Sequence, residues 1–99
     1  MRQKDKTTDT VIRTDERVDN GNTYRYELVM RRGDGVACWR IPLYSIRVRL
    51  TLTDGTTTDA TVKDVFADLG RAILFYEKML KNLATPVDLA YILEDEMTV

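Results

Sequence analysis

Four arginines are the side chains whose types and spacing point most directly to chemistry. Arg25 and Arg31 lie in one stretch that alternates polar and apolar residues, and Arg47 and Arg49 lie in another. Alternate side chains of a β-strand share a face, so we expect the four arginines on one side of a sheet. Such a cationic sheet face would suit phosphate, RNA or an acidic partner.

An ordinary solvated surface is the opposing interpretation of the same residues. Glu27 and Asp59 are expected on neighbouring strands, where cross-strand pairing balances the arginine charges. The same carboxylates near Arg25 and Arg47 also leave open a small-ligand site, or an enzyme that uses carboxylates with arginines. Either of these would need a pocket.

The composition excludes several classes of protein. The chain has 99 residues, with 15 basic side chains, 16 acidic ones and no histidine. Without histidine there is no Ser-His-Asp or Cys-His nucleophile, no imidazole base and no histidine-containing zinc site. Chemistry based on carboxylates or lysine remains open, and the sequence assigns no catalytic residue, no cofactor and no metal.

Nucleic acid and membranes are also disfavoured as partners. The net charge of −1 supplies no long-range attraction to a polyanion. The aromatic residues of the arginine-bearing stretches fall mainly on the opposite, apolar side, whereas stacking of bases needs aromatics beside the positive charge. No run approaches the roughly 20 apolar residues that a membrane-spanning helix requires.

The length predicts a single domain. Residues 1–9 are polar after Met1 and are interpreted as a disordered tail, so the domain is expected over residues 10–99. The single cysteine, Cys38, cannot form an intramolecular disulfide, and no signal peptide is recognisable near the N-terminus. These features predict a cytoplasmic protein, in which Cys38 is a small buried hydrophobe.

Apolar alternation predicts an antiparallel β-meander of four or five strands. Asn20-Gly21 and Asp54-Gly55 are expected at hairpin turns, because both pairs tolerate a positive φ. The residues before Asn20 make the weakest of the expected strands. The expected strands cover residues 11–18, 23–31, 36–41, 44–52 and 56–62.

Near Lys63 the period changes to that of a helix. One long helix is expected over residues 63–84, lying on the sheet. A short final helix should start at Pro86, with Thr85 and Asp88 as a capping box, and run to about Glu94. The predicted fold class is α+β, a meander packed against one long C-terminal helix plus a short final one.

Phe75 does not fit the expected long helix, because it falls within the polar stripe, with Leu74 at the edge. The stripe consists of Asp64, Asp68, Arg71, Lys78 and Asn82. The final helix, which includes Tyr91, also carries too many apolar residues for a one-faced helix. Three explanations remain open: the final helix folds back over Phe75, Phe75 and Leu74 contact another molecule, or the helix bends at Gly70. Leu74, Phe75 and Tyr91 are the candidate interaction surface.

Three segments of the chain resemble a known group of sequences. They are Tyr44-Ser45-Ile46-Arg47-Val48, Leu83-Ala84-Thr85-Pro86-Val87-Asp88-Leu89 and Ile92-Leu93-Glu94-Asp95. The chain is similar to short bacterial proteins, common in anaerobic Gram-positive species, that are grouped as a domain of unknown function. The resemblance covers about residues 24–97, and it implies a bacterial cytoplasmic protein and no particular activity. Asp88 stands where relatives are expected to carry histidine.

The preferred functional interpretation is a small non-enzymatic interaction or regulatory module that associates with itself or with a protein partner. It depends on the position of Phe75. The alternatives are the small-ligand site or enzyme built on carboxylates and arginines and, with less support, nucleic-acid binding through the arginine face.

Overall fold

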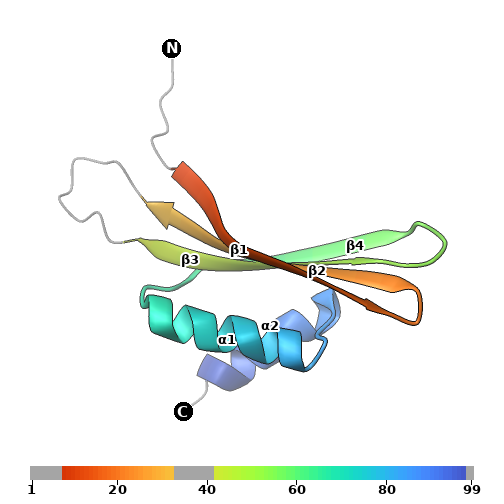
Figure 1. Cartoon of the computed structure of the whole chain (residues 1–99). Coiled ribbons are helices and arrows are strands. Elements are labelled where there is room, and N and C mark those ends of the chain that lie inside the picture. Colours follow the sequence, from red (N-terminus) through yellow and green to blue (C-terminus); the bar gives the residue numbers. More distant parts are fainter. Residues whose placement is uncertain (1–7, 33–41, 98–99) are drawn as a thin grey trace.

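The chain folds into one antiparallel sheet with two helices on one of its faces (Figure 1). The computed structural model describes residues 8–32 and 42–97. The α+β class and the meander are thereby confirmed, with strand order β1-β2-β3-β4. The expected strand over 36–41, with Cys38, lies outside the described residues. The elements are β1 (Thr8–Asp19), β2 (Asn22–Arg32), β3 (Leu43–Thr51), β4 (Thr57–Phe66), α1 (Leu69–Lys81) and α2 (Pro86–Met97).

Both predicted hairpin turns are present. Asn20 and Gly21 have φ values of 54° and 82° and join β1 to β2 as a two-residue turn, the type that needs positive φ at both central positions. The turn from β3 to β4 is longer, and Gly55 takes a φ of 91° within it. The weakly patterned residues before Asn20 form a full strand because β2 provides backbone partners along its length.

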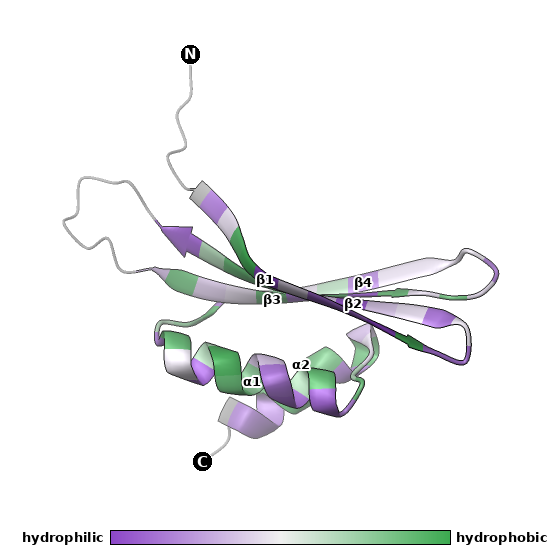
Figure 2. Cartoon of the chain, in the orientation of Figure 1, coloured by the Kyte–Doolittle hydropathy of each residue, from purple (hydrophilic) through white to green (hydrophobic). Residues whose placement is uncertain are grey.

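The inner face of the sheet forms the core with the helices. Hydrophilic and hydrophobic residues alternate along the strands in Figure 2. Alternation therefore places the apolar half of each central strand against α1 and α2, as predicted. The buried inner residues are Tyr24, Tyr26 and Leu28 of β2 and Tyr44, Ile46 and Val48 of β3.

The single long helix expected over 63–84 is wrong. Residues 63–66 continue β4, and Phe66 lies opposite Tyr44 of β3. Asp68 then caps α1 by accepting a hydrogen bond from the backbone N–H of Arg71 at 3.0 Å. The two helices have 13 and 12 residues, so neither is the long one. Adjacent apolar residues such as Val65 and Phe66 suit a strand end as well as a helix start, and pairing with β3 decides between them.

Phe75 is a core residue, which corrects its placement on an interaction surface. Its side chain is 1% exposed, and its ring centroid lies 5.4 Å from that of Phe66. The expected polar stripe included Asp64 and Asp68, but these residues precede α1. Because Asp64 and Asp68 are not part of the helix, Phe75 lies on its buried face. The buried residues of α1 are Ala72, Phe75, Tyr76 and Met79, spaced as one helical face requires.

The start of α2 was predicted correctly. Thr85 donates its backbone N–H to Asp88 at 3.1 Å, and Asp88 donates its N–H to the Thr85 hydroxyl at 3.2 Å. This reciprocal pair is a capping box. The helix continues beyond Glu94 to Met97, and Lys78 of α1 forms an ion pair of 3.6 Å with Glu96.

Candidate functional site

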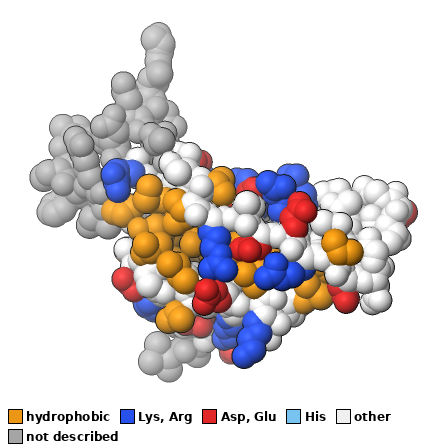
Figure 3. All heavy atoms as spheres, viewed as in Figure 1, with side chains coloured by type: hydrophobic (Ala, Val, Ile, Leu, Met, Phe, Trp, Pro, Cys, Tyr) orange, Lys and Arg blue, Asp and Glu red, His pale blue; other side chains and the backbone are white. Residues whose placement is uncertain are grey.

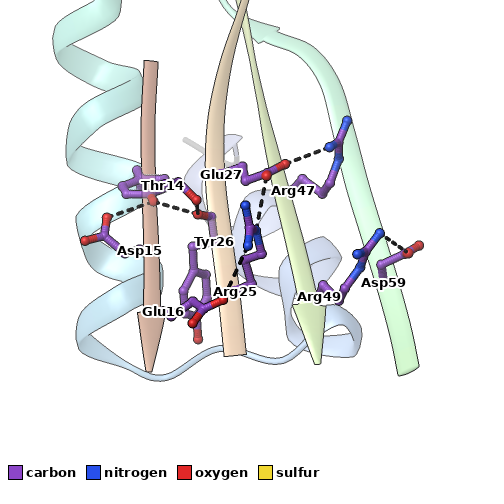
Figure 4. A network of polar contacts seen from close by, with 10 residues as sticks. Thr14, Asp15, Glu16, Arg25, Tyr26, Glu27, Arg47, Arg49 and Asp59 are labelled. Carbon is purple, nitrogen blue, oxygen red and sulfur yellow. Dashed lines mark hydrogen bonds and ion pairs between the residues drawn. The ribbon is translucent and has the colours of Figure 1, made fainter. Parts of the chain in front are cut away.

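Three of the predicted arginines gather on the outer face of the sheet, away from the helices. Arg25 lies opposite Arg49, and Glu27 lies opposite Arg47, in the register of β2 with β3. Figure 4 shows these side chains extending from neighbouring strands. They line an open depression of about 290 Å³.

Glu27 is the centre of this group. Its side chain is 12% exposed, and its two oxygens accept hydrogen bonds from Arg25 at 3.3 Å and from Arg47 at 2.6 Å. Arg25 also donates to Glu16 of β1 at 3.3 Å. The charges of Arg25 and Arg47 are therefore balanced by carboxylates of the chain itself.

Arg49 and Asp59 form the remaining pair of this face, at 3.6 Å. Both side chains are about half exposed, and ion pairs of this kind contribute at most about 1 kcal/mol. The predicted balance of the arginines by Glu27 and Asp59 is thus present, with Glu16 as a further partner. The signal for this pairing in the sequence was the presence of opposite charges at alternating positions of adjacent strands.

Arg31 lies farther along β2 and has a structural role. It donates hydrogen bonds from Nε, at 3.2 Å, and from Nη2 to the carboxylate of Asp64. Asp64 has a φ of 53° at an irregularity in β4, and its N–H donates to the Ser45 hydroxyl at 2.9 Å. Arg31 and Ser45 together stabilise this bulge from the outer face.

The outer face has few of the features that a ligand-binding or catalytic site needs. The depression beside Glu27 is open and at the small end of ligand sites, which are concave and mostly apolar. A second hollow of about 230 Å³ on this face borders Arg31, Ser45 and Arg47. In the described residues, no group of three or more histidine, cysteine, aspartate or glutamate side chains could hold a metal. Neither helix in this part of the chain is long and apolar enough to span a bilayer.

A second polar group connects β1 to α1, and the sequence interpretation did not identify it. The Tyr76 hydroxyl lies 2.9 Å from an Asp15 carboxylate oxygen and 3.0 Å from the Tyr26 carbonyl. Burial raises the pKa of Tyr76, and the hydrogen bond to Asp15 raises it further. Arg13 lies 4.9 Å from the Tyr76 ring centre and donates to Glu77 at 3.0 Å. The group links β1 to α1: the Tyr76 hydroxyl is shared between its two acceptors, and the Thr14 hydroxyl also donates to the Tyr26 carbonyl, at 3.2 Å.

Large apolar side chains are exposed on the helices. Leu74 of α1 is 69% exposed, and Val87 and Tyr91 of α2 are 67% and 68% exposed. The name helix-layer surface is used below for these three residues together with the exposed charged residues beside them on α1 and α2. An open hollow of about 480 Å³ borders Tyr91. Leu74 and Tyr91 were predicted here, whereas Val87, one helical turn before Tyr91, was missed.

The view in Figure 3 has α1 and β1 toward the viewer and shows a different side of the molecule. Charged side chains of both signs lie over α1, and hydrophobic side chains gather beside its first half, toward the strands. Exposed apolar groups are therefore mixed with charges.

Comparison with known proteins gives a family without an assigned activity. A model described as a family of unknown function, DUF6514, matches residues 6–99. The chain belongs to this family. The DUF6514 match includes all four strands and both helices, and it extends the expected resemblance toward the N-terminus. No curated protein and no solved structure matches the chain.

Proposed function

We propose that this DUF6514 chain is a small non-enzymatic protein-interaction module that associates with itself through the helix-layer surface. The exposure of Leu74, Val87 and Tyr91 on the sides of the helices that face away from the sheet carries the proposal. Moving a leucine or valine side chain from water into an interface contributes about 1.5–3 kcal/mol. Several such groups on one surface favour association.

The outer sheet face supports this proposal by contrast. Its arginines are engaged with Glu16, Glu27 and Asp59, and a surface on which charges are already paired gains less from an added ligand. An enzyme based on these groups would need an enclosed pocket, and the depression there is open. Nucleic acid would need uncompensated positive charge.

The resemblance to short bacterial sequences supports a bacterial cytoplasm as the place of action. A chain with one cysteine, Cys38, cannot form an intramolecular disulfide, which fits a reducing compartment.

Light scattering across a dilution series tests the proposal by comparing wild type with two variants. Leu74→Gln removes an exposed apolar group and keeps good helix propensity. Val18→Thr is the matched control, because Val18 is 71% exposed but lies on the outer side of β1, and threonine keeps the strand propensity. Phe75 is unsuitable, since a substitution there opens the core.

We expect wild type to be a dimer that dissociates on dilution. Leu74→Gln should weaken the dimer at least about tenfold, which corresponds to about 1.4 kcal/mol, and Val18→Thr should leave the mass unchanged. A wild-type monomer at every concentration would contradict the proposal. So would a Leu74→Gln variant that associates as strongly as wild type.

A further inference from the structure

We infer that the helix-layer surface is covered by a second copy of this chain, with α1 of each copy lying against α2 of the other. The inference rests on the proposed self-association and names the pairing that produces it. Its basis is that each helix exposes apolar groups surrounded by charged residues. These charges are positive on α1 and negative on α2.

On α1 the exposed apolar group has basic neighbours. Residues three, four or seven positions apart lie on one side of a helix. Leu74 therefore has Arg71 on one side and Lys78 and Lys81 on the other, all three exposed. The guanidinium of Arg71 also lies 5.8 Å from the ring centre of Phe66. The acidic residue nearby, Glu77, is directed to the sheet, where it accepts a hydrogen bond from Arg13 at 3.0 Å.

On α2 the neighbours are acidic. Tyr91 lies one turn after Val87, and Asp88, Glu94 and Asp95 are three or four positions from Tyr91. All of them are exposed. No lysine or arginine occurs in α2, so this half of the helix-layer surface has a uniformly negative border.

Both halves face the same way. α1 and α2 lie on one side of the sheet and run in roughly opposite directions (Figure 1), and each buries the side that faces the sheet. The ion pair of 3.6 Å between Lys78 and Glu96 connects the two helices. A partner that meets this surface therefore contacts a basic helix and an acidic helix side by side.

A two-fold rotation axis in the plane of the interface, parallel to α1 and α2 and midway between them, places α1 of one copy over α2 of the other. The same rotation makes the reciprocal contact, as an isologous dimer requires. Each contact then joins basic residues to acidic ones around Leu74 and Tyr91. Placing α1 on α1 would bring like charges together, which is unfavourable. A foreign partner would need the same two-signed pattern, which the chain itself already carries.

Two charge-reversed variants test the pairing by light scattering. The first is Arg71→Glu with Lys81→Glu on α1, and the second is Glu94→Lys with Asp95→Lys on α2. Lys78 is left unchanged because of its pair with Glu96, and Asp88 because it is part of the capping box. Circular dichroism of each variant checks that the fold is retained.

Each variant alone should dimerise at least about tenfold more weakly than wild type, because both reciprocal contacts then join like charges. An equimolar mixture should regain the wild-type mass, since the reversed α1 meets the reversed α2 in one contact and the native pair forms the other. The four substitutions combined in one chain should likewise restore the homodimer.

A mixture that remains monomeric would overturn the pairing, as would variants that dimerise like wild type. In either case a weakened Leu74→Gln dimer would leave the proposed self-association standing, whereas a monomeric wild type would remove both. Salt supplies a measurement that needs no variant. The dissociation constant of wild type should rise between about 0.05 M and about 0.5 M NaCl as the charges are screened, and a constant value would overturn the inference.

Discussion

The hydroxyl of Tyr26 donates a hydrogen bond of 2.8 Å to the carbonyl of Ala84. Tyr26 lies in the middle of β2, and Ala84 lies in the short turn between α1 and α2. Both are buried, with exposed fractions of 0% and 1%. The Tyr26 side chain thus provides the hydrogen-bond donor for a carbonyl in the turn between α1 and α2. This turn sets the orientation of the two helices and hence the directions in which Leu74 and Tyr91 point.

Removing this hydroxyl should destabilise the fold. Tyr26→Phe leaves the buried Ala84 carbonyl without its donor, and an unsatisfied buried polar group costs about 1–3 kcal/mol. Urea unfolding followed by circular dichroism measures the loss. Tyr91→Phe makes the same chemical change on a solvated side chain and should alter stability by less than about 0.5 kcal/mol. Equal stability of Tyr26→Phe and wild type would show that the bond contributes nothing.

Alkaline pH should weaken the same contact. Burial raises the pKa of Tyr26 from 10.0 to about 12, so between these values the unfolded chain releases a proton that the folded chain keeps. The stabilisation is complete below pH 10 and is lost as the pH rises through about 12. The stability difference between wild type and Tyr26→Phe should therefore shrink over this interval, measured by urea unfolding at several pH values. A difference that stays constant would contradict the assigned pKa.

The two glycines of the hairpin turns should respond differently to alanine. Gly21 and Gly55 both have positive φ, but a Cβ on Gly21 would lie 2.7 Å from Cγ2 of Thr53, whereas none of the surrounding atoms is within 4 Å at Gly55. Backbone strain alone costs about 1–2 kcal/mol. Gly55→Ala should show roughly that loss in thermal unfolding, and Gly21→Ala a larger one. Equal losses would mean that Thr53 moves aside without cost.

Neutralising Glu27 should expose the positive charge of the outer sheet face. In Glu27→Gln the guanidinium groups of Arg25 and Arg47 lose their shared carboxylate, so retention on a heparin column at low salt should increase. Wild type should pass through. Glu94→Gln makes the same change of net charge on α2 and should pass through as well. Salt-dependent retention of wild type would instead support a polyanion site on the arginine face.

Part of the candidate site was predictable because strand alternation has a fixed period. Arg25, Arg47 and Arg49 share a face for that reason, and the apolar residues between them form the core. The network of Asp15 and Tyr76 was not predictable, since it joins residues 61 positions apart whose contact depends on how α1 lies on the sheet.

By itself the sequence determined the meander, both hairpin turns and the start of α2. These features depend on neighbours in the chain: alternation, Asn-Gly or Asp-Gly pairs, and the capping box of Thr85 with Asp88. Only the tertiary structure decided that residues 63–66 are a strand and that Phe75 is buried. The local sequence of residues 63–66 suits a helix and a strand about equally. Pairing of Phe66 with Tyr44 across the sheet decides for the strand. The direction of the buried side of α1, and hence the exposure of Leu74, follows from that pairing.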